Sequence, residues 1–113
     1  MKVIVCGGRD YDDEKRVYEV LDQQFRGSPI TLVIQGGARG ADTLGRLWAD
    51  ARRVDCLTVP AKWDQHGRSA GPIRNARMLD YKPDLVVAFP GGQGTSNMVM
   101  QAKRAGVPVI KVD

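Results

Sequence analysis

Five short apolar runs alternate with four amphipathic segments, and this alternation is the feature that most narrows the folds open to the chain. The runs cover residues 3–6, 31–34, 56–59, 85–89 and 107–112. Each is continuous rather than alternating in polarity, as in strands buried on both faces of a parallel sheet. With right-handed crossovers, this order predicts an α/β fold: a three-layer, doubly wound parallel sheet of five strands in the order 3-2-1-4-5.

The four amphipathic segments are predicted to be helices that bury one face each. They span about residues 13–27, 41–51, 72–82 and 96–105. Asp12 or Asp13 suits the cap of the first helix, and Pro72 suits the first turn of the third. The predicted inward residues are Val17, Val20, Leu21 and Phe25; Ala41, Leu44, Trp48 and Ala51; Ile73, Ala76 and Leu79; and Met98, Ala102 and Ala105. The remaining long segment, 60–71, is predicted to be a functional loop.

Length, charge and cysteine usage narrow the class of protein further. With 113 residues the chain is expected to form one domain, residues 1–113, and no apolar run predicts a membrane span or a signal peptide. Cys6 and Cys56 lack CxxC spacing, so we expect thiols in a reducing, cytoplasmic compartment and no metal site. The net charge of +4 favours an anionic partner but is modest for a dedicated nucleic-acid binder.

Glycines gather in three clusters, each placed after a predicted strand and before a predicted helix. The clusters are Gly7 and Gly8; Gly36, Gly37 and Gly40; and Gly91, Gly92 and Gly94. In the predicted strand order the three loops meet at one crevice, at the carboxyl ends of neighbouring strands. Glycine lets a ligand approach the backbone closely, and free N–H groups at helix N-termini attract phosphate. The clusters therefore favour a ligand site over three unrelated tight turns.

The helix after the third cluster offers the best phosphate seat, because it opens with Gly94, Thr95 and Ser96 and carries no acidic residue there. Replacing Gly94 by a β-branched residue is expected to abolish nucleotide binding, since backbone freedom and backbone access are both lost. No loop has the Lys-Ser/Thr ending of a P-loop or a complete GxGxxG pattern, which disfavours an ATPase or an ordinary dehydrogenase.

Charged and amide side chains flank the same crevice. Arg9 and Arg39 are expected to contact the ligand, and Asp42 either holds Arg39 or accepts a bond from a ribose hydroxyl. Arg74 and Asn75 are predicted to lie in the first turn of the third helix. There, ligand contact is favoured over a merely solvated face.

The segments GGRDY, GGARGAD, W-x-x-HG-x-x-AGPIRN and VVAFPGGQGT together resemble the SLOG superfamily, and within it the small YpsA-related proteins often found in bacteria and phages. The resemblance covers nearly the whole chain. It implies a Rossmann-like fold that binds a nucleotide or a nucleotide-derived ligand. The superfamily includes the Lonely Guy phosphoribohydrolases, which release cytokinin bases from nucleoside monophosphates, and DNA-processing protein A, which binds single-stranded DNA.

One departure from that resemblance bears on catalysis. Phosphoribohydrolases carry PGGxGTxxE, whose glutamate acts at the glycosidic bond, whereas this chain has Met98 at that position. A methionine cannot activate water or stabilise an oxocarbenium ion. Arg74 matches an arginine of those enzymes, so the resemblance implies a phosphate-binding half without the hydrolytic half, and we expect no strong phosphoribohydrolase activity. Catalytic residues are not identified; the weak candidates are Asp10, Asp42, Asp64 and His66.

The aromatic residues and the single histidine each leave two interpretations open. Trp63 either stacks on a base or anchors the long loop on the core. Trp48, at helical spacing, belongs to the core or to a subunit contact. His66 either holds a turn or contacts the ligand, and one histidine with scattered carboxylates is poor metal-ligand chemistry.

Three functions follow as hypotheses. The first is a sensor or carrier for a nucleoside phosphate or an ADP-ribose-like molecule, with no cofactor certain. The second is a hydrolase for an N-glycosidic or phosphate bond of a nucleotide. The third, a module for single-stranded nucleic acid, is disfavoured by dispersed charge and by an aromatic content of 6%. The sequence leaves open whether the chain forms a homo-oligomer.

Overall fold

The computed structural model describes residues 1–113 and contains one five-stranded sheet. The strands are β1 (Lys2–Cys6), β2 (Leu32–Gln35), β3 (Asp55–Thr58), β4 (Leu85–Ala88) and β5 (Val109–Lys111). They lie in the order β3-β2-β1-β4-β5, and every neighbouring pair is parallel. The predicted strand order and the doubly wound α/β fold are confirmed.

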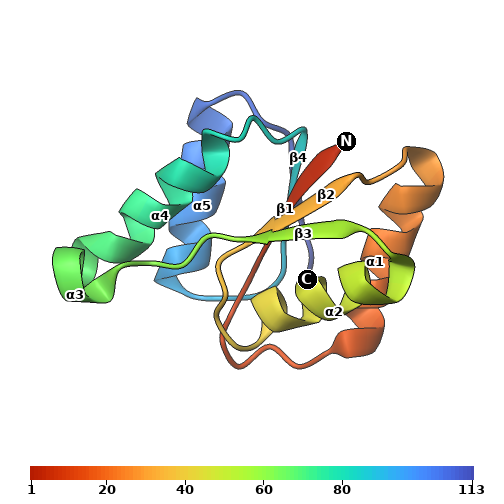
Figure 1. The fold of residues 1–113 in the computed structure, drawn as a ribbon, viewed down its shortest axis with the longest axis horizontal. Helices are drawn as coiled ribbons and strands as arrows, with labels where there is room; N and C mark the ends of the chain where they lie inside the picture. Colours follow the sequence, from red (N-terminus) through yellow and green to blue (C-terminus); the bar gives the residue numbers. More distant parts are fainter.

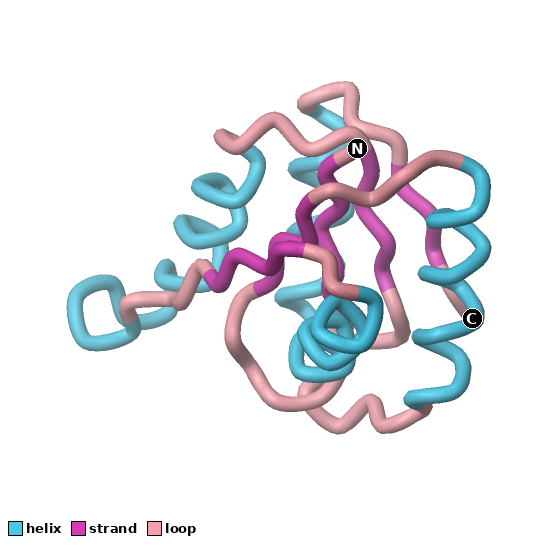
Figure 2. Tube along the Cα trace, turned by 45° about the vertical axis from the view of Figure 1, so that its right-hand side comes forward, coloured by secondary structure: helices cyan, strands magenta, loops and turns pink.

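Helices cover both faces of the sheet and complete three layers (Figure 1). The helices are α1 (Glu14–Gly27), α2 (Ala41–Arg52), α3 (Trp63–His66), the 3-10 turn η1 (Gly67–Ser69), α4 (Ala70–Leu79) and α5 (Gln93–Arg104). In Figure 1, α1 and α2 lie on the right of the sheet and α3, α4 and α5 on the left; Figure 2 shows the strands between the two groups. None of these helices has the length and apolar character needed to cross a membrane.

Two apolar clusters, one on each face of the sheet, hold the layers together. The cluster toward α1 and α2 includes Val3 and Leu21, and the cluster toward α4 and α5 includes Ile4 and Met98. Adjacent residues of β1 thus point to opposite clusters, as the twofold repeat of a strand requires. Residues of the central strands are buried almost throughout, while β3 and β5 at the edges are partly exposed. The prediction of burial on both faces was therefore wrong for the edge strands, because no further strand covers them.

The segment 60–71 is largely helical and is not the irregular loop predicted from the sequence. Residues 63–66 form α3, residues 67–69 form η1, and α4 begins at Ala70, ahead of Pro72. Pro72 is the third residue of α4, where a missing N–H costs no intrahelical hydrogen bond. Neither α3 nor η1 buries a side chain. An element without a buried face leaves no amphipathic signal in the sequence.

Some of the predicted inward helix residues need correction. Ala51, Ile73, Ala76 and Ala105 are exposed; the other predicted residues are buried or partly buried. On α4 the buried side contains Asn75 and Met78 instead. The apolar spacing was misleading there because α4 turns a polar side chain inward, toward the loops described below.

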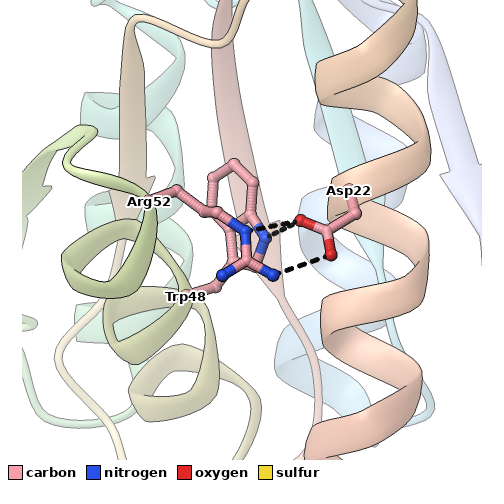
Figure 3. A network of polar contacts seen from close by, with 3 residues as sticks. All are labelled: Asp22, Trp48 and Arg52. Atoms are coloured by element: carbon pink, nitrogen blue, oxygen red, sulfur yellow. Dashed lines mark hydrogen bonds and ion pairs between the residues drawn. The ribbon is translucent and has the colours of Figure 1, made fainter.

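Trp48 is a core residue, fully shielded from solvent, and it belongs to a polar network between α1 and α2 (Figure 3). Its indole Nε1 donates a hydrogen bond of 2.9 Å to Oδ1 of Asp22. Arg52 donates two more to the same carboxylate, from Nε at 2.9 Å and from Nη2 at 2.8 Å. Phe25 meets the indole edge-on at 5.5 Å. The buried indole thus has its polar atom satisfied, and the two helices are held in register.

Replacing Asp22 by asparagine is expected to destabilise the protein at neutral pH by about 1–2 kcal/mol, because the ionised acceptor of three hydrogen bonds is lost. The bonds from Arg52 lower the pKa of Asp22. Its stabilising contribution is therefore complete above the ordinary aspartate pKa near 4 and is lost as pH falls through the lower folded value. Urea unfolding at pH 7 and pH 3 should show a smaller difference for D22N than for the natural chain.

The matched control is Asp50→Asn. Asp50 pairs with Arg46 at 3.6 Å on the exposed side of α2. Its loss should cost less than about 0.5 kcal/mol at either pH. Equal effects of D22N and D50N would contradict a special role for the Asp22 network.

Candidate functional site

The three glycine loops meet around the backbone of Gly8. Its N–H donates to the carbonyl of Pro90 at 2.8 Å, and its carbonyl accepts from the N–H of Ala41 at 3.1 Å. The loop after β1 is thereby joined to the loop after β4 and to the start of α2. As predicted from the strand order, the three loops lie together at the carboxyl ends of neighbouring strands.

Beside this junction lies a cavity of about 780 Å³, which we call the central cleft. The sequence-predicted residues that line it are Gly7, Gly8, Arg9, Gly36, Gly37, Arg39, Asp42, Trp63, Arg74, Asn75, Gly92, Gly94 and Thr95. Its volume lies within the usual range for small-molecule sites. The walls come from all three glycine loops, from α3 and from α4.

Six of the predicted residues lie outside the central cleft: Asp10, Gly40, Asp64, His66, Gly91 and Ser96. Gly40 and Gly91 instead allow their loops to pack closely against the loop after β1. A Cβ on Gly91 would lie 2.6 Å from the backbone nitrogen of Gly8. The side chains of Asp64 and His66 are exposed on α3 and have no hydrogen-bond partner within the protein. Neither residue lines the central cleft.

Arg74 is the cation most deeply placed in the central cleft. Its Nη1 donates to the carbonyl of Gly36 at 3.1 Å, and its Nε donates to Oδ1 of Asn75 at 3.0 Å. Burial lowers the pKa of Arg74, and the nearby charge of Arg9 lowers it further, yet a guanidinium remains protonated at neutral pH. Three of its five N–H donors have no partner in the protein. Arg74 is thus a cation held in place by two hydrogen bonds, with three N–H donors available to a ligand.

Asn75 connects α4 to the first turn of α5. Its Nδ2 donates to the carbonyl of Gly94 at 3.2 Å and to Oδ1 of Asn97 at 3.1 Å. Asn97 also accepts from Nε2 of Gln101 at 2.7 Å. The predicted pair Arg74-Asn75 is therefore bonded to two segments at once, the loop after β2 and the start of α5. Asn75 is almost completely buried, so its role is to position the loop.

Asp42 is the one carboxylate that lines the central cleft, and it does not hold Arg39. It accepts from the N–H of Ala38 at 3.2 Å. Burial raises the pKa of Asp42, an effect that the bond from Ala38 and the charge of Arg74 oppose. Arg39 instead pairs with Asp10 at 3.1 Å on the exposed rim.

Cys6 lines the floor of the central cleft as an unreactive thiol. Burial and the nearby carboxylate of Asp42 raise its pKa to about 12. A thiol with that pKa is protonated at neutral pH and is a poor nucleophile.

Gln35 is a positioning residue that the sequence reasoning missed. Its side chain is buried at the end of β2, where Oε1 accepts from the N–H of Gly37 at 2.6 Å. Its Nε2 donates to the hydroxyl of Thr58 at 2.6 Å. The signal was present in the sequence, since Gln35 is a polar residue between a buried apolar run and the glycines it orients.

The start of α5 faces the central cleft with free backbone donors. The first intrahelical bond comes from Ser96, whose N–H donates to the carbonyl of Gly92 at 3.0 Å. The helix begins three residues earlier than predicted, at Gln93, so the N–H groups of residues 93–95 are the unpaired ones. The backbone N–H of Ser96, which was predicted to belong to the phosphate seat, is thus already paired within the helix. The first turn carries no acidic residue and no capping side chain.

Gly94 does not need the conformational freedom predicted for it. It lies within α5 and is absent from the glycines of positive φ. A Cβ added there would meet nothing within 4 Å. Its lack of a side chain matters only for access from the cleft.

Trp63 forms one wall of the central cleft and is about half exposed. The guanidinium carbon of Arg9 lies 5.7 Å from the centre of its ring, within range of a cation–π contact. Trp63 thus lies beside Arg9 and near Gly71, where an added Cβ would stand 3.6 Å from its ring. It is not buried in the core.

Met98 faces away from the central cleft. It is 1% exposed and packs in the apolar cluster between α5 and the sheet. A glutamate placed at this position would enter that apolar cluster, so Met98→Glu would cost stability before it could add a catalytic group.

Comparisons with known proteins agree with this architecture. A family model described as "YspA, cpYpsA-related SLOG family" matches residues 1–66. The Gene 61 protein of Mycobacterium phage D29 is 37% identical over 117 residues, which cover 96% of this chain and 94% of that protein. The X-ray structure of DNA processing protein A from Streptococcus pneumoniae superposes with a TM-score of 0.53 at 16% identity. The match covers 96% of this chain but 57% of that one, and it supports the fold.

Proposed function

The chain belongs to the YspA, cpYpsA-related SLOG family, and on that premise we propose that its central cleft binds a nucleotide or nucleotide-derived ligand, such as a nucleoside phosphate or an ADP-ribose-like molecule. The observation that carries the proposal is the convergence of two kinds of unused donor in one cleft. Arg74 has three free N–H donors, and Gly94 and Thr95, which also line the cleft, have free backbone N–H groups. A sensor or carrier needs this binding and no bond cleavage.

The anionic end of the ligand belongs at the start of α5. Backbone N–H groups and the positive end of the helix dipole favour phosphate there. Arg74 adds a guanidinium, whose planar fork suits two phosphate oxygens. Asn75 supports both partners, because it bonds Arg74 and the carbonyl of Gly94.

The sugar and base belong toward α2 and α3. Asp42 offers carboxylate oxygens that accept bonds from ribose hydroxyls, and Trp63 offers an aromatic face about half open to solvent. A base would stack on Trp63 beside or in place of Arg9. Arg9 and Arg39 supply further positive charge at the rim.

The hydrolase alternative rests on Asp42, since no other carboxylate lines the cleft. The nucleic-acid alternative rests on the net charge of +4 and on the shared fold with DNA processing protein A. Single-stranded binding usually relies on several stacking aromatic residues along a basic groove, whereas the central cleft offers Trp63 alone. Small-molecule binding is therefore the function we propose.

The proposal predicts that the natural chain binds AMP or ADP-ribose and that Gly94→Val removes this binding, because the new side chain covers the backbone donors of α5. The matched control is Gly27→Val, at the end of α1, where an added Cβ also meets nothing. Both variants should remain folded by circular dichroism. Titration calorimetry at two salt concentrations measures the affinities.

The outcomes separate the functions. Unchanged AMP affinity in G94V, or equal losses of affinity in G94V and G27V, would refute the proposal that the ligand's phosphate binds at the start of α5. Tight binding of an oligonucleotide with a steep salt dependence would favour the nucleic-acid alternative, since that slope reports the number of neutralised phosphates. Release of base from AMP by the natural chain at about 1–10³ per second would favour the hydrolase.

A further inference from the structure

A second cavity, of about 590 Å³, lies at the carboxyl ends of β4 and β5, beside α5. We call it the edge cleft. The segment 90–95 separates it from the central cleft, and Thr95 is the one residue that lines both. The edge cleft therefore has its own walls and plays no part in the function proposed above.

The floor of the edge cleft is apolar. Phe89, Val99 and Val112 lie at its base and are almost fully buried, whereas Met100 in its wall is 43% exposed. The apolar surface that a ligand can remove from water is therefore mainly that of Met100, with a small part of Val99. Covering exposed apolar surface with an apolar group of a ligand is favourable.

The walls of the edge cleft are cationic. Lys103, Arg104 and Lys111 line it, and no aspartate or glutamate does. None of the three forms an ion pair, although four arginines elsewhere in the chain do. Three unpaired positive charges around one cavity repel one another, and an anion relieves that repulsion. The hydroxyls of Thr95 and Ser96 add neutral donors.

From this combination we propose that the edge cleft binds a small organic anion, in which an apolar body carries a carboxylate, sulfonate or phosphate group. The apolar body covers Met100 and the exposed part of Val99, and the anionic group lies among the three cations. A bare inorganic anion leaves Met100 in contact with water, and a neutral apolar molecule leaves the cations unpaired. Both parts of the ligand are needed.

The test uses a fluorescent aromatic sulfonate, 8-anilinonaphthalene-1-sulfonate, against its neutral analogue N-phenyl-1-naphthylamine. We expect the sulfonate to bind the natural chain at least about tenfold more tightly. The double variant Lys103→Gln with Lys111→Gln should weaken sulfonate binding about tenfold. Ser96→Phe, which fills the cleft without removing charge, should weaken it as well.

The matched control removes two exposed, unpaired cations of α1, by Lys15→Gln with Arg26→Gln. It has the same net charge as the first double variant and should leave the affinity within about twofold. Equal binding of the sulfonate and its neutral analogue would overturn the proposal. So would equal losses in the two double variants, an unchanged affinity in S96F, or displacement of the sulfonate by inorganic phosphate at the same concentration.

Discussion

Replacing Arg74 by methionine is expected to weaken the binding of AMP by about a hundredfold. Methionine keeps the apolar stem but removes every N–H donor, including the three that have no partner in the protein. Arg74→Lys retains the charge without the planar fork and should fall between the two. Affinities are measured by titration calorimetry at constant salt.

Arg39→Met is the matched control. Arg39 also lines the central cleft, but its side chain is 76% exposed and is paired with Asp10. Its loss should change AMP affinity by no more than about fivefold. If R74M binds AMP as the natural chain does, Arg74 is not a ligand-binding residue.

Arg74 also anchors the loop after β2 through the carbonyl of Gly36, so R74M must be shown to keep its fold. Thermal unfolding followed by circular dichroism distinguishes a role of Arg74 in ligand binding from a role in stabilising the fold. A binding role lowers AMP affinity in a protein whose circular dichroism at 25 °C is unchanged. Loss of the folded signal at that temperature would instead assign Arg74 to the scaffold.

The alanine variant of Gly40 should be destabilised by about 3–5 kcal/mol, with Tm lower by roughly 10–20 °C. Gly40 has φ +80° and ψ −130°, a backbone conformation that side chains disfavour. A Cβ would also lie 2.6 Å from the carbonyl carbon of Arg9. Because that neighbour is backbone, the conflict can be relieved only by moving two loops apart.

Gly94→Ala provides the comparison for Gly40→Ala. Gly94 is helical, its φ is ordinary, and an added Cβ meets nothing. Alanine should leave stability unchanged or raise it by up to about 1 kcal/mol. Thermal unfolding of the two variants side by side measures the difference. Similar Tm values would show that the loops around Gly8 are not closely packed.

Much of the fold could be predicted because its determinants are local. The runs that became β1 and β4 are continuous and apolar, and this pattern arises where helices cover both faces of a sheet. Crossover handedness then leaves few strand orders, and the predicted order was right. The glycine clusters predicted the place of the central cleft because the loops that follow parallel strands all lie at the carboxyl-end edge of the sheet.

Helix α4 shows where local pattern fails. Its apolar residues Ile73 and Ala76 are exposed, while the polar Asn75 is buried. Asn75 points inward because it donates hydrogen bonds to Gly94 and Asn97. These partners lie about twenty residues away in sequence and become neighbours only in the folded chain, so the local pattern could not reveal them. Helix α3, which buries no residue, left no periodic signal either.

The sequence alone determined the strand order, the edge of the sheet where the loops meet, and the presence of Arg74 and Asn75 among the residues there, since each follows from short-range pattern and chain geometry. It did not determine the partner of each charge. A bond to Arg39 was one of two roles expected of Asp42, the other being a bond from a ribose hydroxyl; in the structure Arg39 pairs with Asp10 and Asp42 lies near Arg74. The sequence also did not distinguish glycines such as Gly40, where an added Cβ would meet backbone within 3 Å, from glycines such as Gly94, where it would meet nothing. The difference depends on which backbone segment passes close by, and this is decided only when the layers assemble.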